Sequence, residues 1–311
     1  MKRLLSAMQM ESEVRSRHDL LYAAARGSSL QSDAIRSQWK ELEKACEKSL
    51  AHRREPWLKI SLARILITAL QATGQYEKML VELKSCPLPR VEANLYTAVT
   101  SLELGLLGNA IKHAHAARDE YKPGSSNWLV CTDVAIRGHL LSGNADSSLL
   151  LAAEIRRHPR LAERNTELES WIAMLEAYCN SFRQLTLQQP PRRGRPTHTY
   201  LRLRAQLRDA STTRQVYISL NIWQLIDTKA QQDHPLYEQT LQNLLRYVRR
   251  RSNLRDRDRL GVFVEFIFTH RYTPPSANEM ATFKRQLKAL GSTYSRGEVI
   301  SYEILGRVLT G

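Results

Sequence analysis

The chain has 311 residues, of which 42% are apolar and 25% charged, and its formal net charge is +15. The length and the apolar and charged fractions are typical of a globular protein with one large or two ordinary domains, whereas the net charge is unusually positive. No apolar run is long enough to span a membrane, and the N-terminal apolar run is too short for a secretory signal. The sequence therefore predicts a soluble, cytoplasmic protein without a membrane partner.

The positive charge is concentrated in the C-terminal part of the chain. Residues 186–311 contain 21 of the 46 Lys and Arg residues but only 10 of the 31 Asp and Glu residues. Such a local excess is typical of a surface that neutralises nucleic-acid phosphates. An acidic protein surface, or no polyanion at all, is the alternative interpretation.

The residues that could carry chemistry are scattered. The four cysteines have no metal-binding spacing and predict small core residues in a reducing compartment, so no metal and no cofactor are expected. No Walker A loop, GxSxG elbow or HExxH motif occurs. The carboxylates of a nuclease can lie far apart in sequence, and the candidates for that alternative are Asp209, Asp227 and Glu265.

Residues 1–185 have helical periodicity almost throughout. Residues 1–54 predict a capping hairpin, with a capping box that begins at Ser28 before the helix containing Trp39. Three glycines then recur between apolar helical runs, at intervals of 31 and 38 residues: Gly74, Gly105 and Gly143. Prolines stand where the second helix of each unit should end: Pro87, Pro123 and Pro159.

Residues 55–185 resemble the tetratricopeptide repeat. The turn glycines, the aromatic Tyr76 after the first of them, and small residues on one face of a second helix match that pattern: Ala110, Ala114 and Ala117. The resemblance implies an α–α superhelix whose concave face binds a protein partner. A non-repetitive helical domain is the alternative.

A basic, proline-rich linker is predicted over residues 186–197. Its segment QPPRRGRP resembles the AT-hook, whose Arg-Gly-Arg core lies in the minor groove of A·T-rich DNA. The resemblance places Arg193 and Arg195 in the groove and Arg192 on a phosphate. A stiff connection between domains is the alternative interpretation.

Period-two alternation and β-branched or aromatic composition predict three strands after the linker, at about 201–207, 215–220 and 261–269. The first would present Arg202 and Arg204 on its outer face. Helices are predicted at about 222–231 and 235–251, the second ending in a cluster of arginines: Arg246, Arg249, Arg250 and Arg251. Two capping boxes, Ser276–Glu279 and Ser295–Glu298, predict two final helices, with Gly291 closing the first of them.

The segment 214–248 resembles the strand–helix–helix order of ribbon-helix-helix DNA-binding proteins. That resemblance implies that Arg214, Tyr217 and Ser219 face the major groove. A single α+β domain with a small antiparallel sheet is the preferred alternative, and an all-α domain is a further one.

The sequence thus predicts a mainly α protein with a repeat domain (1–185), a linker (186–197) and a basic α+β or all-α domain (198–311). The predicted function is a non-enzymatic adaptor or regulator that binds protein through the repeats and DNA or RNA through the basic domain. The alternatives are a protein-interaction scaffold and a nucleic-acid-processing enzyme. Fragments 1–185 and 197–311 are each expected to fold alone. The oligomeric state stays open.

Overall fold

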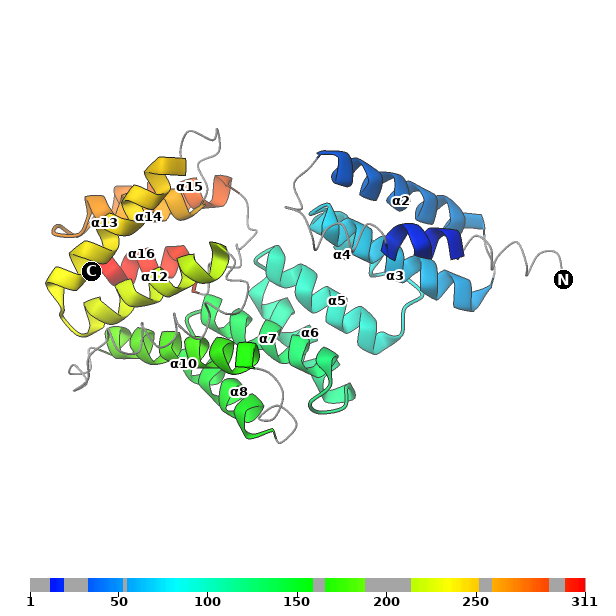
Figure 1. Ribbon diagram of the computed structural model, residues 1–311, viewed down its shortest axis with the longest axis horizontal. Helices are drawn as coiled ribbons and strands as arrows, with labels where there is room; N and C mark the ends of the chain where they lie inside the picture. Colours follow the sequence, from blue (N-terminus) through cyan, green and yellow to red (C-terminus); the bar gives the residue numbers. More distant parts are fainter. Residues whose placement is uncertain are drawn as a thin grey trace. The chain divides into compact units, whose positions relative to one another are not determined.

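The computed structural model describes residues 12–19, 33–52, 55–158, 166–187, 214–251, 259–290 and 300–310. These residues are mainly α-helical, as predicted, and none of them belongs to a β-strand (Figure 1). The chain divides into two compact units, Met1–Tyr121 and Lys122–Gly311. Across the ranges just given, no helix combines the length and the apolar character needed to cross a membrane.

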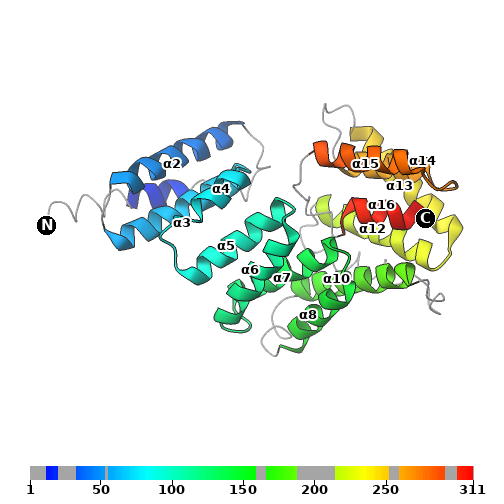
Figure 2. The same ribbon diagram turned by 180° about the vertical axis from the view of Figure 1, so that it is seen from behind.

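The first unit contains a short helix over residues 12–19, followed by five helices that each pack on the next in chain order (Figure 2). Its core includes Trp39 and a row of buried side chains on the second long helix. The elements are α2 (Asp33–His52), α3 (Pro56–Ala72), α4 (Tyr76–Glu82), α5 (Arg90–Glu103) and α6 (Leu107–Glu120).

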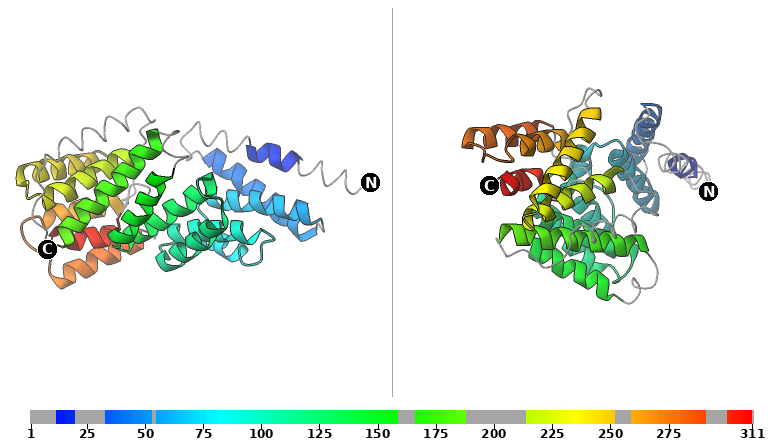
Figure 3. Two further views of the ribbon diagram at one scale, coloured as in Figure 1. Left: turned by 90° about the horizontal axis from the view of Figure 1, so that it is seen from below. Right: turned by 60° about the vertical axis from the view of Figure 1, so that its left-hand side comes forward.

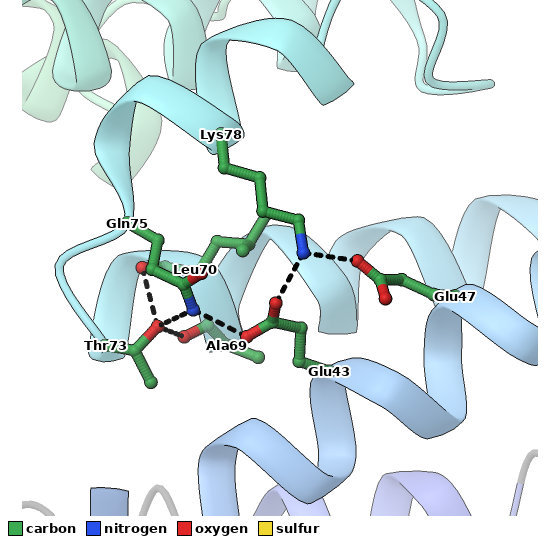
Figure 4. Close-up of polar contacts among 7 residues, drawn as sticks. All are labelled: Glu43, Glu47, Ala69, Leu70, Thr73, Gln75 and Lys78. Atoms are coloured by element: carbon green, nitrogen blue, oxygen red, sulfur yellow. Dashed lines mark hydrogen bonds and ion pairs between the residues drawn. The ribbon is translucent and has the colours of Figure 1, made fainter.

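A polar network fastens α2 to the turn between α3 and α4 (Figure 4). The side chain of Glu43 is only 8% exposed, and its carboxylate accepts hydrogen bonds from Gln75 Nε2 at 2.6 Å and Lys78 Nζ at 2.6 Å. Lys78 also pairs with Glu47 at 2.6 Å. The hydrogen bonds that Lys78 donates to the two carboxylates raise its pKa, so the ammonium balances the buried charge. The charged and polar groups of the network are therefore paired with one another, and we interpret the network as one that stabilises the fold.

The second unit continues the same pattern of neighbouring helices (Figure 3). Each helix described in this unit packs on the described helices that precede and follow it in the chain, and α14 (Arg259–Thr269) contacts both helices that follow it. The elements are α7 (Ser126–Leu141), α8 (Ala145–Arg157), α10 (Thr166–Thr186), α12 (Arg214–Ala230), α13 (His234–Arg251), α14 (Arg259–Thr269), α15 (Ala277–Ala289) and α16 (Tyr302–Thr310).

The same turn joins four helix pairs. Gly74, Gly105 and Gly143 have positive φ angles of 71°, 71° and 79°, as expected for turn glycines. Each stands two residues after the last residue of its helix, and the amide after it bonds a carbonyl five residues back: Leu106 N to Ser101 O is 2.8 Å. Gln232, with φ 59°, has the same position between α12 and α13, and Asp233 N bonds Thr228 O at 2.9 Å. The hairpin geometry therefore recurs in the C-terminal part, where no glycine marks it.

Substitutions at two of these turns should change stability in opposite directions. Gly105→Val places a β-branched residue at positive φ and should destabilise the protein by about 1–3 kcal/mol. Gln232→Gly removes the strain of an L-residue in the left-handed conformation. This gain exceeds the entropy cost of introducing glycine, so the variant should be more stable than the unmodified protein by about 0.5–1 kcal/mol. Urea denaturation of both variants tests this. A stabilising Gly105→Val or a destabilising Gln232→Gly would contradict the shared turn geometry.

Helix α12 is the most enclosed element of the second unit, because all residues from Ile218 to Thr228 are buried. A seam of hydrogen bonds joins it to α10. Trp223 Nε1 donates to Ser181 Oγ at 3.1 Å, and Ser181 Oγ donates to Asp227 Oδ1 at 2.6 Å. The buried hydroxyl of Tyr178 donates to the carbonyl of Ser219. Helices on the two sides of the predicted linker therefore pack on each other.

The predicted strands at 215–220 and 261–269 are wrong, because these residues lie in α12 and α14. Polar and apolar residues alternate in the first segment, but exposed and buried side chains do not, since Ser219 is as buried as Ile218 and Leu220. In the second, Phe263 stacks on Tyr302 with ring centroids 4.4 Å apart, so tertiary packing overrides β-propensity. The described part of residues 198–311 is thus all-α, which leaves the ribbon-helix-helix pattern without its strand.

The remaining local predictions have mixed outcomes. The capping box of Ser276 and Glu279 is confirmed, and it opens α15. The helices α4 and α6 end before Pro87 and Pro123, as predicted. Several predictions lie outside the described residues: the strand at 201–207, the capping boxes beginning at Ser28 and Ser295, Gly291 and Pro159.

Candidate nucleic-acid interface

Helix α13 is amphipathic, and its inner face is apolar. Asp233 caps its start, because Asp233 Oδ1 accepts a hydrogen bond from Leu236 N at 3.1 Å. The buried stripe follows helical spacing and consists of Tyr237, Thr240, Leu241, Leu244 and Leu245. The helical spacing in the sequence predicts that Leu241, Leu244, Leu245 and Val248 are buried; the three leucines are buried, whereas Val248 is only half-buried. The stripe directs the opposite side of the helix toward solvent.

After its first turn, where His234 and Pro235 are exposed, the outer face of α13 carries only amides and guanidinium groups. Its exposed residues recur three or four positions apart: Gln239, Gln242, Asn243, Arg246, Arg249 and Arg250. Arg246 Nη2 donates to Asn243 Oδ1 at 2.9 Å, which orients its guanidinium along the face. The one acidic residue of the helix is Glu238, which is half-buried and pairs with Arg271 at 3.6 Å. We call these six exposed residues the arginine face.

The arginine face has the chemistry of a polyanion-binding surface. Arginine stays charged at any physiological pH, and no carboxylate of α13 lies on this face. Cations near a helix C-terminus are favoured by the helix dipole, which accounts for part of their placement. Guanidinium and amide groups are also those that contact phosphates and base edges.

The structure brings together only part of the predicted site. Arg246, Arg249 and Arg250 share the arginine face, whereas Arg251 ends the same helix with a side chain that is not described. Arg214 begins α12, and its side chain is likewise not described. The others lie outside the described residues: Arg192, Arg193, Arg195, Arg202 and Arg204. Ser219, predicted to face DNA, is instead buried against α10.

A second group of cations, which is not among the predicted site residues, lies on α15. Only Phe283 and Leu287 of this helix are fully buried, and three cations are exposed along it: Lys284, Arg285 and Lys288. The signal that predicts them is the capping box, because it sets where the helix begins. Counting helical positions from that start places these cations on the exposed side.

The candidate nuclease residues do not form a described site. Asp227 is buried and accepts a hydrogen bond from Ser181, Glu265 is exposed on α14, and Asp209 lies outside the described residues. Within the described part of the chain, no three His, Cys, Asp or Glu side chains gather to hold a metal ion. Burial raises the pKa of the Cys46 and Cys179 thiols to about 12, so both stay protonated.

The arginine face and the recurring helical hairpins are therefore the features from which a function can be inferred. No protein-family model, curated protein or solved structure matches this chain.

Proposed function

We propose that the protein is a non-enzymatic adaptor or regulator that binds DNA or RNA through its C-terminal helices and a protein partner through its helical hairpins. The observation that carries the nucleic-acid part is the arginine face, where three exposed arginines share one side of α13 without a carboxylate from that helix. The exposed cations of α15 add to the positive charge of the same unit.

The protein-binding part of the proposal is supported by the hairpins. Helix pairs closed by the same turn pack mainly on their chain neighbours, which is how helical repeats build extended binding surfaces. A scaffold that docks an acidic protein instead of nucleic acid is the competing proposal, and binding to nucleic acid decides between them.

Replacing Arg246, Arg249 and Arg250 together with Gln should weaken binding to DNA and RNA. Each lost phosphate contact lowers the slope of log K against log salt by about 0.7–0.9, so the slope should fall by about 2–3. At physiological salt the affinity should drop on the order of a hundredfold, by a similar factor for all sequences. Fluorescence anisotropy with labelled DNA and RNA at several salt concentrations measures both quantities.

A matched control removes the same charge from the other unit. Lys48, Lys84 and Lys112 are exposed on helices or turns of the first unit, and replacing them together with Gln should leave the slope nearly unchanged. Equal losses in the two triple variants would indicate an unspecific charge effect. Absence of binding by the unmodified protein would refute the nucleic-acid proposal and favour the scaffold.

The linker can be tested in the same assay. If it acts as an AT-hook, Arg193→Ala with Arg195→Ala should abolish a preference for A·T-rich duplex and cost about 1–3 kcal/mol. If it only connects the two parts, the affinity for all nucleic-acid sequences should fall slightly and equally. The slope of log K against log salt should then be lower by up to about two. We expect the second result, because the folded helices already present an arginine face.

A further inference from the structure

An open hollow lies between α14 and α15, and it has an aromatic floor. Its volume is about 290 Å³. The rings of Phe266 and Phe283 stack with centroids 3.9 Å apart and planes 9° from parallel, and the His270 ring lies 4.7 Å from Phe266. Phe283 is buried, whereas Phe266 and His270 are partly exposed. The hollow therefore presents parts of the Phe266 and His270 rings to solvent, and the Phe283 ring supports Phe266 from within.

A third helix sets the position of the floor. A Cβ atom on Gly306 of α16 would lie 2.5 Å from Phe283 Cε1, which is closer than two non-bonded carbon atoms can approach. The absence of a side chain at Gly306 thus allows the ring of Phe283 to lie against α16 and stack on Phe266. The position of the floor is therefore fixed by the packing of helices and does not depend on a surface loop.

The rim of the hollow is polar and can both donate and accept hydrogen bonds. It consists of Asn278, Glu279, Thr282 and Gln286, all exposed on α15. The side-chain and backbone hydrogen bonds from Ser276 lower the pKa of Glu279, so its carboxylate is charged at neutral pH. Arg285 Nη2 lies 3.4 Å from Thr282 Oγ1, which places a guanidinium beside the rim.

We propose that this hollow receives one unpaired base of a single-stranded nucleic acid, an inference that rests on the proposed nucleic-acid binding. A flat base has a π-face for the aromatic floor and a hydrogen-bonding edge for the amide and hydroxyl groups of the rim. The negative charge of Glu279 disfavours a phosphate inside the hollow, whereas Arg285 can contact the backbone beside it. The volume is just below the roughly 300 Å³ at which pockets for drug-sized ligands begin, so it suits one ring system.

The geometry also selects the form of the nucleic acid. The bases of a duplex are stacked and paired, so their faces cannot reach an aromatic floor without unstacking. A base in a single strand is free to stack on protein rings, and this type of contact depends little on sequence. The partner is therefore a single strand, bound through its backbone by the cations and through a base by the hollow.

The test uses the full chain with a short single-stranded oligonucleotide and with the same oligonucleotide paired to its complement. His270→Ala removes a partly exposed ring, and the double variant Asn278→Ala with Gln286→Ala removes rim contacts without touching the core. Each should lower single-strand affinity by about tenfold and leave the salt slope and the duplex affinity unchanged, because no phosphate contact is lost. Thr269→Ala, exposed on α14 outside the hollow, is the control and should bind as the unmodified protein does.

The outcomes separate the two proposals. If the protein binds nucleic acid but prefers duplex, or if the hollow variants bind the single strand unchanged, the base site is refuted while the arginine face stands. If the unmodified protein binds neither form, the proposed function fails and the base site fails with it. A fall in the salt slope of the hollow variants would show that the hollow contacts phosphate, which also overturns the proposal.

Discussion

A fragment of residues 122–311 should unfold in one cooperative transition, whereas a fragment of residues 197–311 should not. The shorter fragment lacks α10, which covers one side of the enclosed helix α12. The apolar side chains of α10 that become buried include Ile172, Leu175, Tyr178 and Phe182. Burial of each contributes about 1.5–3 kcal/mol, so losing these four removes about 6–12 kcal/mol, comparable with the whole stability of a domain.

Circular dichroism and tryptophan fluorescence in a urea titration measure the effect, since Trp223 lies in the seam and is present in both fragments. The fragment of residues 1–185 ends within α10 and contains its buried side chains without α12, so it should expose apolar surface and bind a hydrophobic dye. Cooperative unfolding of residues 197–311, at the midpoint of the longer fragment, would instead support the domain boundary predicted from charge and periodicity.

The second large effect is expected at Tyr178. Its side chain is fully buried and its hydroxyl donates to the carbonyl of Ser219, while burial raises its pKa well above the usual value and keeps the hydroxyl protonated. Tyr178→Ala leaves a cavity between α10 and α12 and should destabilise the second unit by about 3–5 kcal/mol. Chemical denaturation of the full chain, followed by fluorescence, measures the change in the free energy of unfolding.

Tyr178→Phe is the matched variant, because it keeps the ring and removes only the hydroxyl. It should cost about 0.5–1.5 kcal/mol, the net contribution of one hydrogen bond. A loss as large as that of Tyr178→Ala would mean that the polar seam, and not the packing of the ring, holds α10 on α12. No loss in either variant would show that these helices do not pack as described.

Local signals in the sequence determined several features correctly. Glycines such as Gly105 marked hairpin turns, because glycine adopts positive φ at little cost. The pair Ser276 and Glu279 marked the start of α15, because a capping box is made by residues three positions apart. The spacing of the leucines in α13 predicted its buried stripe. In each case the interactions that decide the structure are close together in the chain.

Only the tertiary structure decided the rest. Gln232 takes the conformation of a turn glycine with no local sign, and residues 261–269 form a helix although their composition favours a strand. The hollow needs rings from α14 and α15 and the bare backbone of Gly306 in α16. The seam between α10 and α12 joins residues more than 40 positions apart, across a segment that composition marks as a linker. These features depend on which faces of distant helices become buried together, and that burial energy exceeds the local preferences that periodicity and composition reveal.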